Sequence, residues 1–372
     1  MQTSKKAALS GLGIILALTA AACGSSKTTT ATTVKAGAAT TAAATATTAA
    51  AGATTAAPAA AGGKGGKMAI LFDLKGRGDK SFNDSAAIGL DKAKAEFGYT
   101  VTEQVRGDND IAEQLKKAAD AGNTLIIGVG FAWGDEMEKA AAANPKVNYA
   151  IVDSVQKAPN IAGLVFKANE GSFLVGAAAA LKSTTGHIGF IGGVDIPLIQ
   201  DFFVGYEAGA KAAKPDIKID TQYISAAGDF SGFGAPDKAK TIALKMYGDG
   251  ADVVYHAAGG SGDGLFGAAK EFSAKGKKVW AIGVDSDQAK TEPADLAPFI
   301  LTSMIKHVDV SVYETMKANA AGTFKGGAQV FSAKVGGVDY ATTGGAIDDI
   351  KAKLDAYKAD IGSGKIVVPS KG

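Results

Sequence analysis

The sequence predicts an α/β fold of two Rossmann-like lobes, whose parallel sheets are joined by crossovers, with a ligand cleft between the lobes. Length is the first observation, because 372 residues are too many for one ordinary core and enough for two. The second is that apolar runs alternate with amphipathic runs from Met68 onward, as in parallel sheets flanked by helices. The third is that the alternation restarts near Gly171 with a second unit of similar size.

The pattern places the elements in order. Gly98 ends the first helix and Asn109 or Asp110 caps the second, because these residue types favour helix termini. The strands predicted in the first unit cover residues 68–73, 99–105, 124–130, 147–153 and 160–166, and the helices cover 81–98, 109–122 and 133–145. The strands predicted in the second unit cover residues 187–193, 217–225, 251–259 and 278–285, and the helices cover 171–184, 199–215, 236–250 and 262–276.

We expect the chain to cross between the lobes several times. The first lobe is expected at residues 68–166, completed by residues 302–325 with a helix that begins near Ser303. The second lobe is expected at residues 167–301, completed by residues 326–368. Ligands of open α/β sheets bind beyond the carboxyl ends of the strands, so the cleft should lie there.

Residues 1–23 have the anatomy of a signal peptide. Lys5 and Lys6 precede an apolar stretch that is too short to span a bilayer and that leads through small residues to Cys23. Small residues before a lone cysteine resemble a bacterial lipoprotein signal, which predicts lipidation of Cys23 and anchoring at the extracytoplasmic face of the cell membrane. Ala20 stands where leucine is usual, and the alternative is an ordinary secretory signal with a chance cysteine.

Residues 24–67 are rich in alanine, threonine and glycine. One valine is their only large apolar side chain, so the segment cannot bury enough surface to offset its ordering entropy. It is expected to be a disordered tether with a reach of about 35–40 Å. The alternative is a polyalanine helix, which the threonines, the glycines and Pro58 disfavour.

Composition and motifs argue against several classes of function. The 39 basic and 37 acidic residues nearly cancel, so no strong field favours nucleic acid. One cysteine and three histidines exclude an intrachain disulfide and leave little material for a metal site. Neither GSGDG nor GRGDKS, which Asp79 interrupts, is interpreted as a phosphate-binding loop, and no G-x-S-x-G is present. His256 is interpreted as structural, and we expect neither an enzyme nor a cofactor.

Carboxylates and aromatic side chains gather where predicted strands end. Aromatic faces stack on planar rings, and carboxylates accept hydrogen bonds from adjacent sugar hydroxyls. A phosphate site would instead want lysine, arginine and helix N-termini. The pattern therefore predicts a site for a neutral ring joined to a polyol. The residues that follow strands in this way are Asp73, Phe82, Phe131, Ala132, Trp133, Asp153, Ser154, Asp195, Phe230, Phe233, Asp285, Ser286 and Asp287.

Several of these residues also have a purely structural interpretation. Asp73 and Asp153 are candidates for helix caps, because aspartates at strand ends often take that role. Phe82 is a candidate for the core of the following helix, and Phe230 is interpreted as structural. Phe233, in a loop of small residues, is harder to explain by packing.

The order of several motifs resembles the basic membrane protein family. The motifs DKSFN, YAIVD, NEGSFLVGAAAA, GFIGG, DFSGF, GADVVYHAAGGSGDG, IGVDSDQ and TSMIKHVD follow one another as in that family, over residues 68–368. Its members are substrate-binding lipoproteins of ABC transporters with the type I periplasmic-binding-protein fold. The resemblance implies a monomeric receptor that captures a nucleoside, with purines favoured, and delivers it to a cognate ABC permease.

The resemblance also implies roles for eight residues. Phe82 and Phe233 would sandwich the base, and Asp73 and Asn83 would bind its edge. The ribose region would be addressed by Asp153, Asp285 and Lys306, while Gly259 would let the backbone approach the ligand.

Some residues depart from the family pattern. Gly234 and Ala235 replace a common Asn-Asp pair, and Lys75 and Arg77 lie in a loop that is usually less charged. A surface receptor or sensor for a sugar or a signalling furanose, and an enzyme, remain as alternative functions.

Overall fold

The computed structural model describes residues 64–107 and 110–371. The predicted signal peptide, Cys23 and the tether up to residue 63 lie outside the described residues. The last residues of the predicted tether belong to the folded body, since strand β1 (Lys67–Phe72) begins at Lys67 and Gly65 donates its N–H to the carbonyl of Phe97 at 2.6 Å. The boundary expected at residue 67 therefore lies a few residues too late.

The first lobe contains a sheet whose strands all run parallel. Apart from β1, its strands are β2 (Thr100–Val105), β3 (Leu125–Gly128), β4 (Asn148–Val152), β5 (Ile161–Phe166) and β11 (Gly327–Phe331). They lie in the order β11-β5-β4-β3-β1-β2. The lobe's helices are α1 (Phe82–Phe97), α2 (Ile111–Asp120), α3 (Gly134–Ala143) and α9 (Val308–Ala320), with a 3₁₀ turn η1 (Phe131–Trp133).

The second lobe repeats this plan, with one antiparallel strand at the edge. Its strands are β6 (His187–Val194), β7 (Lys218–Ser225), β8 (Val253–Ala257), β9 (Trp280–Asp285), β10 (Ile300–Lys306) and β12 (Val338–Tyr340). They lie in the order β12-β10-β9-β8-β6-β7, and only β12 runs antiparallel to its neighbour among these described strands. Its helices and 3₁₀ turns are α4 (Ala168–Lys182), α5 (Pro197–Ala213), α6 (Pro236–Gly248), α7 (Gly262–Ser273), α8 (Gln288–Thr291), α10 (Lys351–Gly362), η2 (Phe230–Phe233), η3 (Gly259–Ser261), η4 (Ala297–Phe299) and η5 (Ala333–Val335).

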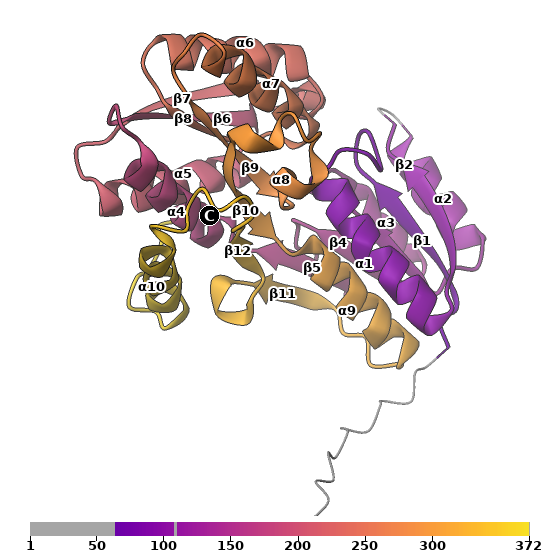
Figure 1. Ribbon diagram of the computed structural model, residues 1–372. Coiled ribbons are helices and arrows are strands. Elements are labelled where there is room, and N and C mark those ends of the chain that lie inside the picture. The colour runs from indigo at the N-terminus through magenta and orange to yellow at the C-terminus, as the bar shows by residue number, and fades with distance from the viewer. Residues whose placement is uncertain (1–63, 108–109, 372) are drawn as a thin grey trace, which may run out of the picture. The chain divides into compact units, whose positions relative to one another are not determined.

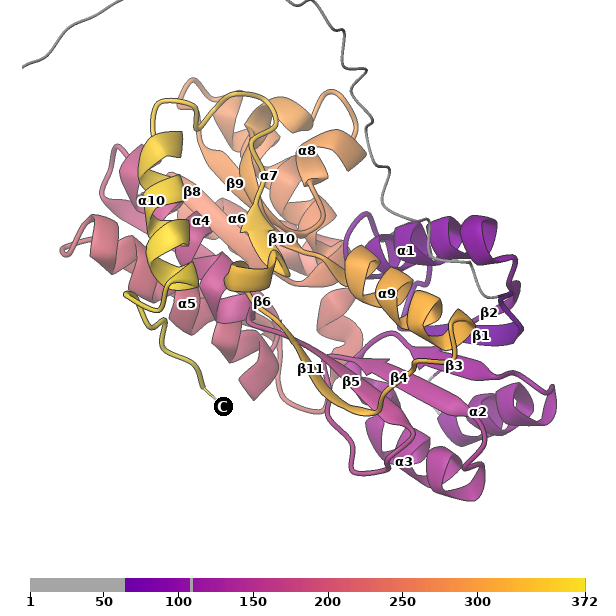
Figure 2. The same cartoon turned by 90° about the horizontal axis from the view of Figure 1, so that it is seen from below.

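The alternation of buried residues along β1 explains how the first sheet is covered. Met68, Ile70 and Phe72 pack in the same cluster as buried side chains of α1, while Ala69 and Leu71 pack with those of α2 and α3. Successive side chains of a strand point to opposite faces, so a strand that is apolar throughout needs helices on both sides. Figure 2 shows α1 and α9 on one face of this sheet and α2 and α3 on the other.

The chain crosses between the lobes at other residues than the sequence predicted. Residues 300–306 form β10 of the second sheet, where we expected the start of a helix of the first lobe near Ser303. Residues 327–331 form β11, which pairs with β5 in the first sheet although we expected this segment in the second lobe. Helix α9 does join the first lobe, where it lies beside α1 (Figure 1). The carboxyl ends of strands from both sheets border one cavity.

Candidate functional site

One cavity is lined by residues from both lobes at the carboxyl ends of the strands. Its empty volume is about 690 Å³, including the part that is open to solvent. Its walls are Asp73, Leu74, Lys75, Asp79, Phe82, Asn83, Gly130, Phe131, Asp153, Leu198, Ile199, Phe202, Phe233, Ala257, Ala258, Gly259, Gly260, Val284, Asp285 and Lys306. The set includes all eight residues that the resemblance assigned to ligand binding, while Cys23 lies outside the described residues.

Backbone strain concentrates around this cavity. Among the described residues, the only non-glycine positions with positive φ are Lys75, Lys80, Asp153 and Asp285. Three of them line the cavity, and Lys80 follows Asp79, which also lines it. Side chains rarely adopt this left-handed region, and such strain is typical of functional sites. Asp153 follows β4 and Asp285 ends β9, each with a φ of 64°, so the two lobes present a carboxylate in the same way.

Lys306 and Asp153 form a buried ion pair across the cavity wall. The Lys306 Nζ lies 2.5 Å from Asp153 Oδ2, and the two side chains are only 3 % and 6 % exposed. The same ammonium lies 4.7 Å from the centre of the Phe82 ring, within range of a cation–π interaction. A buried ion pair has lost its hydration, so its remaining hydrogen-bonding capacity is available to a ligand.

The second carboxylate, Asp285, has a different environment. Ser81 donates its hydroxyl to Asp285 Oδ2 at 2.7 Å, and no ion pair forms within the described residues. Burial raises the pKa of Asp285 to about 6, against the charge of Lys306 and the Ser81 hydrogen bond, which lower it. Two carboxylates therefore lie near one ammonium, and Asp285 Oδ1 has no donor among residues 64–107 and 110–371.

Asp73 and Asn83 lie together at the first-lobe end of the cavity. Asn83 Oδ1 accepts the N–H of Asp73 at 3.0 Å, and Asn83 Nδ2 donates to Asp79 at 2.9 Å. Arg106 donates its Nε–H to Asp73 Oδ1 at 2.7 Å, and its side chain is only 6 % exposed. Both ends of the Asn83 amide are thus bonded within the protein, whereas Asp73 Oδ2 has no donor in the described part of the chain.

Neither aspartate that was a candidate helix cap has that role. The N-caps of the neighbouring helices and turns are Ser81, Gly130 and Lys167. Asp79 instead provides the hydrogen-bond acceptor at the start of α1, since its carboxylate accepts the backbone N–H groups of Ser81, Asn83 and Asp84. The capping interpretation of Asp73 and Asp153 is therefore wrong.

The two predicted stacking residues face the cavity from opposite lobes. Phe82 is the first residue of α1 and Phe233 the last of η2, and both are half-buried against the core. The Phe233 ring lies against Gly193, where an added Cβ would come within 2.6 Å of it. Gly259 has a φ of 52° and also contacts Phe233. Glycine is thus required where the Phe233 ring is seated.

Another aromatic pair joins the lobes beside the cavity. The rings of Phe131 and Phe230 meet edge to face at 5.5 Å, and the Arg106 guanidinium lies 5.8 Å from the Phe230 ring. Phe230 does not line the cavity but borders the adjacent opening, which agrees with its interpretation as structural. Trp133, also noted at a strand end, is fully buried in the core of the first lobe.

The sequence did not reveal the part of the cavity wall that α5 forms, and one glycine motif was described incompletely. Leu198, Ile199 and Phe202 line the cavity from the first turns of α5, and the position of that helix directly after β6 was the only signal. Gly262, Gly264 and Gly267 have the G-x-G-x-x-G spacing, which we overlooked. They do not line the cavity, and an added Cβ on Gly264 would come within 1.9 Å of the Pro236 carbonyl.

His256 lies in β8 and is fully buried outside the cavity wall. Its Nε2 is 3.0 Å from Gln288 Oε1, and burial lowers its pKa to about 4. Gln288 Oε1 accepts from both His256 and the N–H of Val284, which links β8 to the end of β9. This arrangement agrees with a structural role.

Two kinds of feature are absent from residues 64–107 and 110–371. These residues contain no group of three or more histidine, cysteine, aspartate or glutamate side chains placed to hold a metal ion. They also contain no helix with the length and apolar character needed to cross a membrane.

Comparison with known proteins assigns the family. Residues 67–369 match the family model described as ABC transporter substrate-binding protein PnrA-like. This chain belongs to the PnrA-like family of substrate-binding proteins. Members of this family are extracytoplasmic, membrane-associated proteins that bind a small ligand and work with an ABC permease, and the family is not one of enzymes.

Individual PnrA-like relatives are similar over most of their length. The ABC transporter nucleoside-binding protein BmpA of Lactococcus lactis subsp. cremoris is 42 % identical over 82 % of this chain and 89 % of its own. Basic membrane protein A of Borreliella burgdorferi is 35 % identical over 78 % of this chain and 84 % of its own. A solute-binding protein of an ABC transporter system from Aeropyrum pernix K1 has a TM-score of 0.71 and 30 % identity, covering 82 % of this chain and 93 % of that one. The predicted two-lobed fold and the predicted family are both confirmed.

Proposed function

We propose that this PnrA-like protein captures a nucleoside, preferably a purine nucleoside, and delivers it to an ABC importer. One observation carries the proposal: Phe82 and Phe233 face one cavity from opposite lobes, and the Lys306–Asp153 pair and Asp285 line the same cavity. Aromatic faces fit a base, and buried charged groups fit the hydroxyls of a sugar. The name of the Lactococcus relative, a nucleoside-binding protein, supports the same ligand class.

The base is proposed to lie between Phe82 and Phe233. Stacking contributes about 1–3 kcal/mol per base and does not depend on which base is bound. Asp73 Oδ2 is free to accept a hydrogen bond from the base edge. Asn83 has less capacity, because its amide already accepts from the Asp73 N–H and donates to Asp79. Asp73 therefore has the larger role in recognising the base edge.

The sugar is proposed to lie against Asp153, Asp285 and Lys306, with Gly259 allowing a close approach of the backbone. Carboxylates accept hydrogen bonds from hydroxyls, and the Lys306 ammonium donates to the sugar oxygens. An unsatisfied buried acceptor costs about 1–3 kcal/mol. We therefore expect a deoxyribonucleoside to bind more weakly than a ribonucleoside.

The protein is proposed to act as a monomer that is lipid-anchored at Cys23. The anchor would hold it beside the permease on the extracytoplasmic face of the membrane.

A competition series tests the ligand class. Adenosine, 2′-deoxyadenosine, adenine and AMP compete with a labelled purine nucleoside for the purified protein, and the apparent Kd of each is measured. We expect adenosine to bind at least about tenfold more tightly than 2′-deoxyadenosine, because the latter leaves a buried acceptor unpaired. Adenine should bind poorly, and AMP should be excluded by the carboxylates.

Two results would contradict the proposal. Equal binding of adenosine and 2′-deoxyadenosine would remove the carboxylates from the sugar site. Preference for free ribose or another sugar over every nucleoside would instead favour a sugar receptor. Native mass spectrometry of the purified protein provides an independent check, because a co-purified nucleoside would be seen directly.

A further inference from the structure

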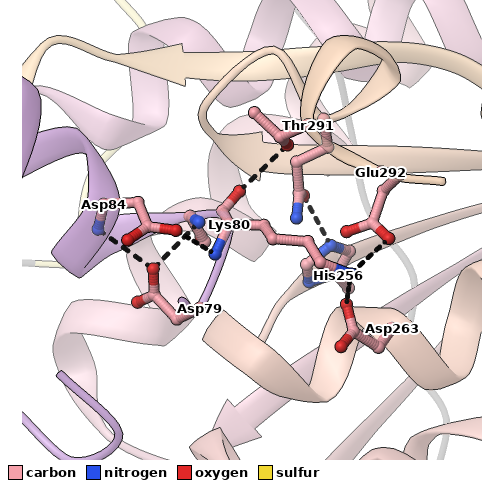
Figure 3. A network of polar contacts seen from close by, with 9 residues as sticks. Asp79, Lys80, Asp84, His256, Asp263, Thr291 and Glu292 are labelled. Atoms are coloured by element: carbon pink, nitrogen blue, oxygen red, sulfur yellow. Dashed lines mark hydrogen bonds and ion pairs between the residues drawn. The ribbon is translucent and has the colours of Figure 1, made fainter. Parts of the chain in front are cut away.

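The segment Asp79–Ser81 belongs to the first lobe but contacts the second. Lys80 Nζ lies 2.9 Å from Glu292 Oε2 and 3.4 Å from Asp263 Oδ1, both on the second lobe (Figure 3). Thr291 donates its hydroxyl to the Lys80 carbonyl at 3.4 Å. We call this segment the latch, because its side-chain and backbone contacts join the two lobes.

Glu292 depends on this contact. Its side chain is fully buried, and its Oε1 has no hydrogen-bond partner within the described part of the chain. Lys80 is therefore the cation that compensates a buried acid in the opposite lobe. Removing one partner of such a pair leaves an uncompensated buried charge, which is strongly unfavourable.

Ser81 connects the latch to the sugar end of the cavity. It is fully buried, and its hydroxyl lies 2.7 Å from Asp285 Oδ2 and 3.2 Å from the Val284 carbonyl. A hydroxyl has one proton, so the shorter, charge-assisted bond to the carboxylate dominates. Ser286 in turn donates to the Ser81 carbonyl at 3.1 Å. One oxygen of Asp285 is thus held from the first lobe, and the other is left for a ligand.

The latch is itself held rigidly within the first lobe. Asp79 accepts the N–H of Ser81 at 3.0 Å and the N–H of Asp84 at 3.1 Å through one oxygen. Its other oxygen accepts from the Asn83 backbone and side chain. Lys80 between them has a φ of 54°, a strained position for lysine that these bonds maintain. The Ser81 hydroxyl is therefore placed by the first lobe before it meets Asp285.

We propose that Ser81 is a positioning residue of the sugar site, and that Lys80 holds it against Asp285 through Glu292 and Asp263. Asp285 is thus oriented for a sugar hydroxyl by a residue of the opposite lobe. This inference rests on the proposed nucleoside function. It adds a residue, Ser81, that affects ribose specificity without itself contacting the ligand.

Titration calorimetry on the full chain tests the proposal with three probes: adenosine, 2′-deoxyadenosine and 3′-deoxyadenosine. We expect Ser81→Ala to weaken adenosine binding about tenfold, the effect of losing one charge-assisted hydrogen bond. The deoxy analogue that lacks the hydroxyl bound by Asp285 should lose little affinity. The preference for adenosine over that analogue should therefore fall by nearly the same factor, which a general loss of folding would not produce.

Ser172→Ala is the matched control. Ser172 is also a fully buried serine with a side-chain hydrogen bond, to Tyr255 at 3.2 Å, but it does not line the cavity. Its substitution should lower the melting temperature without changing the ratio of the affinities.

If Ser81→Ala does not fold, a variant of Lys80 provides a second test of the latch. Lys80→Met should weaken adenosine binding about threefold to tenfold. The double variant Lys80→Met, Glu292→Gln should bind adenosine no more weakly than the weaker-binding of the two single variants, because the two residues act through one contact. Lys182→Met, which removes an ion pair with Asp349 inside the second lobe, is its control and should leave affinity unchanged.

The outcomes separate the two proposals. A wild-type protein that binds none of the three nucleosides would show that the proposed function is wrong, and the inference would fall with it. A wild-type protein that prefers adenosine, together with latch variants that keep the same preference, would overturn the inference alone.

Discussion

Asp285 illustrates the cost of burying a carboxylate in the wall of a cavity. Burial raises the pKa of this carboxyl from 3.8 to about 6. A carboxyl with a raised pKa holds its proton more tightly in the folded state than in the unfolded state. Its contribution therefore opposes folding above about pH 6, and this cost disappears as the pH falls below about 4.

Asp285→Asn should stabilise the ligand-free protein at neutral pH. The neutral amide avoids the cost of a buried charge, so the free energy of unfolding should rise by about 1–3 kcal/mol at pH 7.5 and change little near pH 4. Denaturant unfolding at both pH values measures this. Asp195→Asn, at an exposed carboxylate, is the control. Lower stability of Asp285→Asn at pH 7.5 would show that the ionised form is favoured in the fold.

Phe82→Ala separates a stacking residue from a core residue. If Phe82 stacks on the base, the variant should lose about 1–3 kcal/mol of nucleoside affinity and remain folded. A pure core role predicts instead a loss of about 3–5 kcal/mol in stability. Calorimetry and a melting curve on the same sample decide between them, and Phe324→Ala, at a half-buried phenylalanine outside the cavity wall, controls for general loss of packing. Unchanged affinity with a large drop in Tm would exclude stacking.

At the scale of elements, local pattern predicted most strands and helices but not which sheet each one joins. The apolar period identifies an element from its own residues, whereas β11 is placed by pairing with β5, far away along the chain. At residues 300–306 we expected instead the start of a first-lobe helix near Ser303. The pairing of this segment with β9 decides that it is a strand.

The contact between α1 and α9 fixes α9 to the first lobe and depends on a small residue. A Cβ added to Gly89 would lie 2.1 Å from the Asp309 carbonyl, so the helices could not stay this close. Gly89→Ala should therefore lower the free energy of unfolding by about 1–3 kcal/mol through overpacking.

Gly267→Ala in α7 is the matched control, because nothing lies within 4 Å of the added Cβ. The higher helix propensity of alanine should make it neutral or stabilising by up to about 1 kcal/mol. Chemical denaturation of both variants measures the difference. Equal effects would mean that the α1–α9 contact tolerates a larger spacing.

At the scale of the whole molecule, the same distinction applies to the candidate site. Residues identified by their own position along the chain could be predicted, and residues identified by a distant partner could not. Asp73, Asp153 and Asp285 could be predicted because each follows a strand, and the carboxyl ends of parallel strands meet at one edge. Arg106 and Ser81 could not, because their roles depend on partners that only folding brings near: Arg106 on Asp73, and Ser81 on a carboxylate of the other lobe. The family resemblance named eight residues that line the cavity but not Arg106 or Ser81, which bond to two of them.

The proposed anchor is a property of the whole protein. Cys23→Ser should release the protein from the membrane fraction, because the proposed anchor is dual acylation at this residue, which is strong enough to hold a folded domain at the membrane. Fractionation of cells that express the wild type and the variant measures this. Cys23 is the only cysteine, so Ser25→Ala serves as the nearby control. Unchanged retention of Cys23→Ser would place the anchor elsewhere.

The repeated crossing of the chain between lobes has a consequence for biogenesis. β11 completes the first sheet and β10 and β12 complete the second, yet all three come from the C-terminal part of the chain. Neither sheet can therefore be completed before the C-terminal part of the chain has been synthesised. Until those strands are present, β5 and β9 each leave an unpaired edge that exposes backbone N–H and C=O groups.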